Sequence, residues 1–143
     1  MPNSINNHTN NNLTIITYHY IRNLSNSKYK YLSTLSEHSF KEQLAGIVRK
    51  YKVLTPQEVH NRILNNKKFD SNEIWLTFDD GYVEHYNFVL PLLLDYKISA
   101  TFYPMVYSTK RSKVLDFNKI QFILSLFKNK NIILNEIEQI YNV

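Results

Sequence analysis

Short apolar runs alternate with stretches of helical periodicity along this chain. Runs rich in β-branched and aromatic residues predict strands over residues 13–18, 74–78 and 98–103, with a very short one at Val53-Leu54. Apolar residues at helical spacing predict helices over residues 40–51, 56–64, 82–96, 117–127 and 134–141. Strands separated by helices favour βαβ units, so we expect an α/β fold with a parallel sheet or barrel.

Local signals predict where several of these helices begin and bend. Ser39 with Glu42 three residues later fits a capping box for the first helix. Thr55 followed by Pro56 is typical of a helix start, and Val59, Ile63 and Leu64 would form the buried face of that second helix. Pro91 should kink or divide the helix over residues 82–96. Residues 22–37 and the basic stretch after Tyr107, with Lys110, Arg111 and Lys113, read as surface loops.

Length and composition narrow the class of protein. The 143 residues suit one domain, with residues 1–12 as a disordered Asn-rich tail and residues 13–143 as the folded part. The net charge of +5 is spread thinly, which does not favour nucleic-acid binding as the main role. The absence of cysteine excludes disulfides and thiolate chemistry. No signal peptide or membrane-spanning run is visible, so a cytoplasmic location is expected, with envelope association left open.

Residues 74–82 carry the candidate chemistry. The buried strand ends in Asp79 and Asp80, followed by Gly81, one of only two glycines. Two adjacent carboxylates repel and are costly to desolvate, and a metal ion or a shared proton would relieve that cost. His19 follows the first strand and residues 104–108 follow the last, so all of these should meet at the carboxyl edge of a parallel sheet.

The sequence resembles the NodB-type polysaccharide deacetylases, the carbohydrate esterase family 4 group. Residues 77–81, Thr-Phe-Asp-Asp-Gly, are identical to that family's first signature. Residues 16–21 are similar to its first-strand Tyr-His segment, and residues 98–104 to its Ala-Thr-Phe-Phe strand. The resemblance covers about residues 13–104 and implies an incomplete NodB-like (β/α) barrel.

The resemblance also implies roles for individual residues. Asp79 would be the general base and Asp80 a ligand of a divalent metal of the zinc, cobalt or nickel type, in a deacetylase acting on a carbohydrate polymer or oligosaccharide. A divalent ion activates water and polarises an acetyl carbonyl, while the neighbouring carboxylate accepts the proton. Gly81 would allow a tight turn beside the substrate, and His19, Tyr82 and Tyr103 would lie near the site.

This chain departs from the family pattern in two respects. The family's His-x-x-x-His pair is missing, because none of the five histidines is four residues from another. The later family signatures are missing too, so the metal site is expected to be incomplete. We therefore expect the N-terminal portion of a deacetylase, with little activity alone.

Several alternatives stay open at this stage. Asp79-Asp80-Gly81 could be an ordinary strand-ending turn, His85 a solvent-facing helix residue, and Tyr82 and Tyr103 packing residues. The chain could instead be a non-catalytic carbohydrate-binding or assembly module that self-associates through exposed barrel edges. A magnesium site for phosphate chemistry is a third hypothesis, although no Gly-rich phosphate loop supports it.

Overall fold

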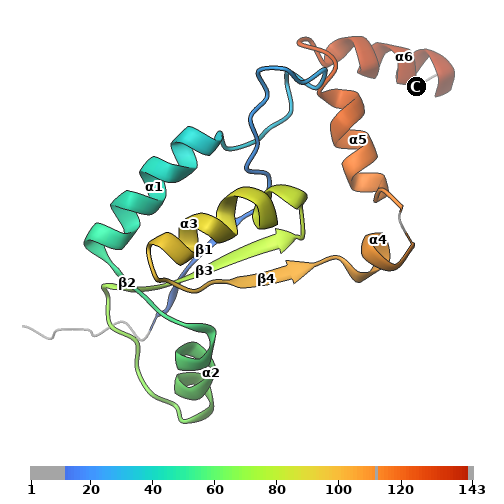
Figure 1. Ribbon diagram of the computed structural model, residues 1–143. Helices are drawn as coiled ribbons and strands as arrows, with labels where there is room; N and C mark the ends of the chain where they lie inside the picture. Colours follow the sequence, from blue (N-terminus) through green and yellow to red (C-terminus); the bar gives the residue numbers. More distant parts are fainter. Residues whose placement is uncertain (1–11, 112, 142–143) are drawn as a thin grey trace, which may run out of the picture.

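A four-stranded parallel sheet forms the centre of the computed structural model, which describes residues 12–111 and 113–141 (Figure 1). The strands are β1 (Thr14–Tyr18), β2 (Lys52–Val53), β3 (Glu73–Asp80) and β4 (Thr101–Pro104). β3 pairs with each of the other three, and every pairing is parallel. The predicted α/β class with parallel strands is therefore confirmed. The predicted tail at residues 1–12 lies almost wholly outside the described residues.

Helices connect and flank the strands. They are α1 (Glu37–Lys50), α2 (Pro56–Leu64), α3 (Leu90–Asp95), α4 (Val106–Arg111), α5 (Asp116–Leu124) and α6 (Asn131–Tyr141). A π-helical turn, η1 (His85–Val89), leads directly into α3, with Pro91 in the first turn of α3. The helical segment is continuous from residue 83 to residue 95, so Pro91 does not divide it; the helix changes from π to α geometry next to Pro91, which has no N–H to continue the hydrogen-bond ladder.

The core lies on one face of the sheet. Successive strand residues point to opposite faces, so Ile74, Leu76 and Phe78 of β3 face the same way. They pack with Phe40 and Leu44 of α1 and with Val89 and Leu93 of η1 and α3, and all of these are buried. On the other face lie Ile15, Thr17, Trp75, Thr77, Asp79 and Tyr103. Ile15 and Tyr103 are 50% and 48% exposed there, so this face is open to solvent.

The start of the first helix differs from the prediction. Ser36, not Ser39, is the N-cap: its hydroxyl accepts a hydrogen bond from the Ser39 backbone N–H at 3.0 Å. Both serines suit the position, but capping by Ser36 adds a turn to the helix. Glu42 is therefore not part of a capping box, and it lies 3.5 Å from His38 Nε2 instead. The predicted cap at Thr55 is confirmed, with a capping box to Glu58.

Three further local predictions need correction. Val59 is buried as predicted, but Ile63 and Leu64 are 58% and 67% exposed, so Val59 is the one buried residue of α2. Of the basic residues predicted to lie in a loop after Tyr107, Lys110 and Arg111 belong to the end of α4, whereas Lys113 lies outside the helices, as predicted. The last strand begins at Thr101 rather than 98, because the chain is still leaving α3 there, with the Ile98 N–H donating to the Leu93 carbonyl at 3.0 Å.

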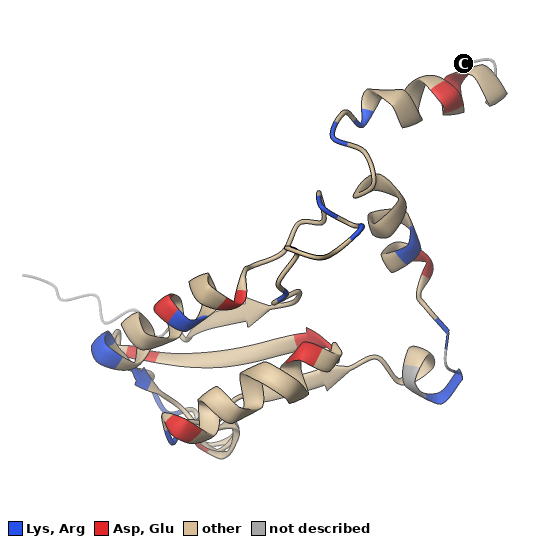
Figure 2. Ribbon diagram, turned by 45° about the horizontal axis from the view of Figure 1, so that its top comes forward, with Lys and Arg blue, Asp and Glu red and all other residues tan. Residues whose placement is uncertain are grey.

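The C-terminal helices extend away from the sheet (Figure 1). α5 contacts the segment after β1, where Tyr29 and Phe122 lie with ring centroids 4.7 Å apart. α6 has no buried residue. Lys and Arg residues lie in separate places along the chain rather than on one face (Figure 2). No helix in the described part of the chain is both long and apolar enough to cross a membrane.

Candidate functional site

The carboxyl ends of β1, β3 and β4 meet at one edge of the sheet. His19 follows β1, and its Nε2 lies 3.7 Å from Asp79 Oδ2 at the end of β3. Asp79 pairs in register with Tyr103, and Asp80 pairs with Pro104. The predicted meeting of these segments is therefore confirmed. Asp79 and Asp80 belong to the strand itself, and the turn begins only at Gly81.

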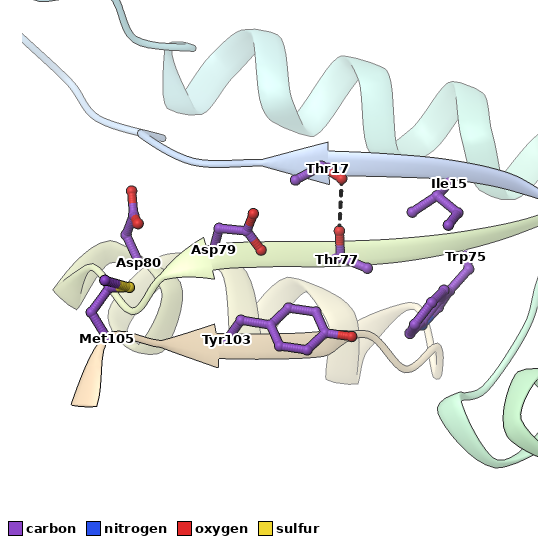
Figure 3. Close-up of a pocket in the computed structure, with 8 residues that line it drawn as sticks. All are labelled: Ile15, Thr17, Trp75, Thr77, Asp79, Asp80, Tyr103 and Met105. Atoms are coloured by element: carbon purple, nitrogen blue, oxygen red, sulfur yellow. Dashed lines mark hydrogen bonds between the residues drawn. The ribbon is translucent and has the colours of Figure 1, made fainter. Parts of the chain in front are cut away.

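The Asp79 side chain lines a hollow on the exposed face of the sheet (Figure 3). The hollow measures about 460 Å³ and is lined by Ile15, Thr17, Trp75, Thr77, Asp79, Asp80, Tyr103 and Met105. Thr77 donates a hydrogen bond of 2.9 Å to the Thr17 hydroxyl across β3 and β1. The Asp79 side chain is 36% exposed, so its carboxylate can reach water or a bound molecule.

The carboxylate of Asp80 is held by a tyrosine. Tyr82 donates a hydrogen bond of 2.8 Å from its hydroxyl to Asp80 Oδ2. Asp80 also adopts a left-handed backbone conformation, with φ of 71°. This conformation is uncommon outside glycine, and aspartate is among the residues that tolerate it best. The two adjacent carboxylates thus have different surroundings: Asp79 borders the open hollow, and Asp80 is bonded to Tyr82. This difference allows them different chemical roles.

Gly81 is required by geometry at this turn. Its φ of 68° lies in the left-handed region, which glycine adopts without steric cost. A Cβ at this position would also lie 2.7 Å from Pro104 Cβ and 2.9 Å from Pro104 Cα. The turn is therefore packed tightly against the end of β4.

A network of hydrogen bonds from α5 holds the Tyr82 side chain in place. Asn118 on α5 donates from Nδ2 to the hydroxyls of Tyr82 at 2.9 Å and Tyr20 at 2.7 Å. The Tyr20 and Tyr82 rings stack with centroids 4.1 Å apart. Burial, together with the neighbouring Tyr20 and Asp80 side chains, raises the pKa of Tyr82 well above its ordinary value. Tyr82 therefore remains a protonated donor to Asp80.

His85 is buried, which corrects the expectation that it faces solvent. Only 3% of the residue is exposed, and its Nε2 lies 2.8 Å from the His19 carbonyl oxygen. Because a carbonyl can only accept, Nε2 carries the proton and Nδ1 does not. Burial lowers the pKa of His85 and outweighs the His19 carbonyl and the Glu84 and Asp80 carboxylates, which raise it. The neutral ring fixes the backbone that presents His19 to Asp79.

The fit of this site to a metal ion is poor. Among the described residues no group of three or more histidine, cysteine, aspartate or glutamate side chains could hold an ion. Asp80 has one oxygen engaged by Tyr82, and the His19 side chain is 54% exposed. A stable zinc-type site needs at least three protein ligands in fixed positions. These residues alone do not provide one.

Asn118 could not be predicted from the sequence, and neither could the ion pair of Arg22 with Glu84. The distance from Arg22 Nη2 to Glu84 Oε2 is 3.0 Å. Asn118 is 98 residues from Tyr20, and Arg22 is 62 residues from Glu84. A lone asparagine on an amphipathic helix has no periodicity or spacing that marks it. For His85, the one usable signal was its place one turn after the Asp79-Asp80-Gly81 motif.

Comparison with known proteins agrees with this geometry. Residues 66–119 match the sequence model of the family described as "Polysaccharide deacetylase". The chain is 36% identical over 53 residues to YxkH of Bacillus subtilis, whose name describes a polysaccharide deacetylase. That match covers 37% of this chain and 19% of YxkH.

Solved structures are similar over a larger part of the chain. The deacetylase PplD of Streptococcus pyogenes, solved with acetate, is 27% identical with a TM-score of 0.60, covering 76% of this chain and 50% of PplD. IcaB from Ammonifex degensii is 26% identical with a TM-score of 0.51, covering 64% of this chain and 37% of IcaB. The chain thus spans half or less of the length of these relatives.

The fold and the motif together define an α/β chain with a parallel sheet that is open on one face, and this chain is similar to polysaccharide deacetylases over part of its length. The predicted resemblance to polysaccharide deacetylases is confirmed. The matched segment includes the whole of β3, Gly81 and β4, so it contains both carboxylates of the site.

Proposed function

We propose that this chain carries the base of a carbohydrate deacetylase, a hydrolase that cleaves acetyl groups from sugars of a polysaccharide or oligosaccharide. The observation that carries the proposal is the position of Asp79. Its partly exposed carboxylate stands at the carboxyl end of the strand bearing the deacetylase motif and opens into the 460 Å³ hollow. The match to the family and the similarity to PplD support the same class of reaction.

In the proposed reaction, Asp79 accepts a proton from a water molecule as the water attacks the acetyl carbonyl carbon. The tetrahedral intermediate then collapses, the C–N bond breaks, and the proton passes to the leaving amine, which gives acetate and a free amino sugar. General base catalysis of this kind typically raises a reaction rate by about 10²–10⁴-fold. His19, 3.7 Å from Asp79, can orient the carboxylate.

Tyr103 and Tyr82 have different places in this scheme. Tyr103 lines the hollow beside Asp79 and is 48% exposed, so its ring can pack against the apolar face of a sugar. Tyr82 is turned toward Asp80 and Asn118 and acts as a support.

Asp80 is the candidate metal ligand, for an ion of the zinc, cobalt or nickel type. Such an ion would supply Lewis-acid activation of the acetyl group. Because the described residues do not complete a site, we expect the chain alone to bind Co²⁺ or Zn²⁺ weakly and to turn over slowly.

The test is acetate release from N-acetylglucosamine oligomers at high protein concentration with added Co²⁺ or Zn²⁺. We expect slow release by the unmodified chain and none above background in Asp79→Asn. Asp95→Asn, at the end of α3, is the matched control and should behave as the unmodified chain. Equal release by Asp79→Asn and Asp95→Asn would refute the role of Asp79.

A second candidate function, self-association as an assembly module, has its own supporting observation. Large apolar side chains are exposed in two places. On the open sheet face, Ile15 is 50% and Tyr103 48% exposed, and on α6, Ile140 is 70% and Tyr141 71% exposed. Apolar surface of this extent favours burial against another surface. Light scattering should show a mass that rises with protein concentration, and a constant monomer mass would count against this function.

A further inference from the structure

The net positive charge of the chain comes from one segment, residues 106–130, which we call the basic arm. Basic residues are spread along the chain, but their excess over acidic residues is not: outside the arm, eleven Lys and Arg are balanced by eleven Asp and Glu. The arm contains one acid and six basic residues, so the whole net charge of +5 arises there. The six are Lys110, Arg111, Lys113, Lys119, Lys128 and Lys130. The arm comprises α4, α5 and the residues that follow each helix, and its Lys and Arg are spaced from α4 to the start of α6 (Figure 2).

The basic arm also exposes apolar side chains. On α5, Asn118 is buried, whereas Phe117, Ile120 and Ile123 are 62%, 56% and 52% exposed. At the helical repeat, Ile120 and Ile123 lie on the side of α5 that is turned away from Asn118. Val106 on α4 is 63% exposed as well. Apolar and basic side chains are thus exposed together over the length of the arm.

The one acid of the arm has its counter-charge beside it. Lys119 donates a hydrogen bond of 2.8 Å from Nζ to Asp116 Oδ1, one turn earlier on α5. Asp116 therefore does little to oppose an anionic partner. The helix that follows differs, because α6 contains Glu136 and Glu138 and no basic residue, so it is not part of this surface.

The combination of basic and apolar side chains selects the kind of partner. A nucleic acid would attract the Lys and Arg side chains through its phosphates, but its hydrophilic backbone would give exposed isoleucines nothing to pack against. A second copy of the arm would be repelled, because both copies carry the same excess of positive charge. A bilayer that contains anionic lipids offers phosphate groups for the basic residues and acyl chains for the apolar ones. No helix in the described residues is long and apolar enough to cross a membrane, so the arm would lie on its surface.

We propose that the basic arm is a binding surface for membranes that contain anionic phospholipids. Phe117, Ile120 and Ile123 enter the boundary between head groups and acyl chains, and the Lys and Arg side chains contact lipid phosphates. The surface is separate from Asp79 and does not depend on the reaction that the chain catalyses. It gives the chain a second activity, attachment to a lipid surface.

The experiment is co-sedimentation of the whole chain with two kinds of vesicle, one of phosphatidylglycerol and phosphatidylcholine in equal amounts and one of phosphatidylcholine alone. We expect binding to the first that weakens as the NaCl concentration rises, and little binding to the second. Lys110→Gln combined with Arg111→Gln should weaken binding about 25-fold, since each basic residue near an anionic surface contributes about fivefold. Phe117→Ser combined with Ile120→Ser should weaken it at least about tenfold, because two apolar side chains no longer enter the bilayer.

The matched control removes the same charge elsewhere. Lys67→Gln combined with Lys68→Gln changes two exposed neighbours outside the arm and should leave binding as in the unmodified chain. An equal loss in this control would show that net charge alone attracts the chain, and would overturn the proposal. Absence of binding to either vesicle would overturn it directly.

The apolar variant separates the remaining possibilities. Full vesicle binding by Phe117→Ser with Ile120→Ser would overturn the proposal, since the apolar side chains would then have no part in it. The thermal melting curve of this variant should match that of the unmodified chain, because both side chains are exposed. A dimer in solution that this variant converts to monomer would assign the arm to a second copy of the chain instead.

Discussion

Two consecutive residues at the site, Asp80 and Gly81, have left-handed backbone conformations, with φ of 71° and 68°. A non-glycine residue in this region costs of order 1 kcal/mol, and such conformations occur often at functional sites. The alternation of side chains along β3 directs Asp79 to the open sheet face, while the Asp80 carboxylate meets Tyr82. The left-handed conformation begins at Asp80 and leads the chain into the turn at Gly81.

The two glycines of the chain give a matched test of this geometry. Gly81→Ala should lower the free energy of unfolding by about 2–3 kcal/mol, from the positive φ and the overlap of a Cβ with Pro104. Gly46→Ala, inside α1 with no atom within 4 Å of the new Cβ, should raise it by about 0.5–1 kcal/mol. Urea unfolding of both variants measures the difference, and equal effects would contradict the geometry described for Gly81.

Burial of neutral His85 predicts a loss of stability in mild acid. Its pKa is lowered in the folded state, so the unfolded chain binds the proton more readily. The stabilising contribution is complete above the ordinary pKa near 6.5 and is lost as the pH falls below it, at up to about 1.4 kcal/mol per pH unit. His85→Gln, which keeps a donor for the His19 carbonyl, should show a flatter profile between pH 7.5 and 5.5 in unfolding experiments. The same slope in both proteins would show that His85 does not titrate in this way.

At the scale of elements, the start of β3 depends on a buried charge cluster. Glu73 is 2% exposed, and its carboxylate accepts hydrogen bonds from Arg62 Nη2 at 2.8 Å and Lys52 Nζ at 3.0 Å. The Asp70 backbone N–H donates to it as well, at 3.0 Å. These contacts connect α2, β2 and the turn before β3 to the central strand. An isolated buried carboxylate would be costly, so each partner is needed.

Glu73→Gln should destabilise the chain by about 2–3 kcal/mol, because Arg62 and Lys52 lose their hydrogen bonds to an ionised carboxylate. Burial alone would raise the pKa of Glu73, but the contacts with Arg62, the Asp70 N–H and Lys52 lower it to about 2. The stability from Glu73 is therefore present above its ordinary pKa near 4.5 and is lost as the pH falls toward 2.

Acid and urea unfolding of Glu73→Gln, compared with Glu42→Gln on the exposed surface of α1, measures this contribution. Glu42→Gln should change the free energy of unfolding by no more than about 0.5 kcal/mol, as is usual for exposed positions. A similarly small effect of Glu73→Gln would show that the cluster is not important for the fold.

Local signals predicted some element boundaries and missed others for physical reasons. The start of α2 was predictable because Thr55, Pro56 and Glu58 all favour the same position. Two serines three residues apart both suit the start of α1, and local sequence alone does not distinguish them; Ser36 takes the N-cap position. The exposure of Ile63 and Leu64 depends on what lies beside α2, which periodicity cannot show.

At the scale of the whole molecule, the parallel sheet and the positions of Asp79, Asp80 and His19 could be predicted, because each of these residues lies at the end of a strand with a clear apolar pattern. The support for the site could not, since it comes from residues distant in sequence. His85 reaches a residue 66 positions away and Asn118 one 98 positions away. Such contacts exist only after folding, and no local sequence pattern around His85 or Asn118 predicts them.

The site therefore spans almost the whole described chain, from the end of β1 to α5. The central claim about it is that Asp79 accepts the proton and Asp80 does not. Asp79 opens into the hollow beside Tyr103, whereas Asp80 is held by Tyr82. The two aspartates are adjacent and chemically identical, so each is the natural control for the other.

The most direct measurement is the rate of acetate release from N-acetylglucosamine oligomers as a function of Co²⁺ concentration for the unmodified chain, Asp79→Asn and Asp80→Asn. We predict a slow rate that rises with Co²⁺ in the unmodified chain. Asp79→Asn should stay at background at every Co²⁺ concentration, and Asp80→Asn should lose the Co²⁺ dependence. A Co²⁺-stimulated rate in Asp79→Asn equal to that of the unmodified chain would contradict the account.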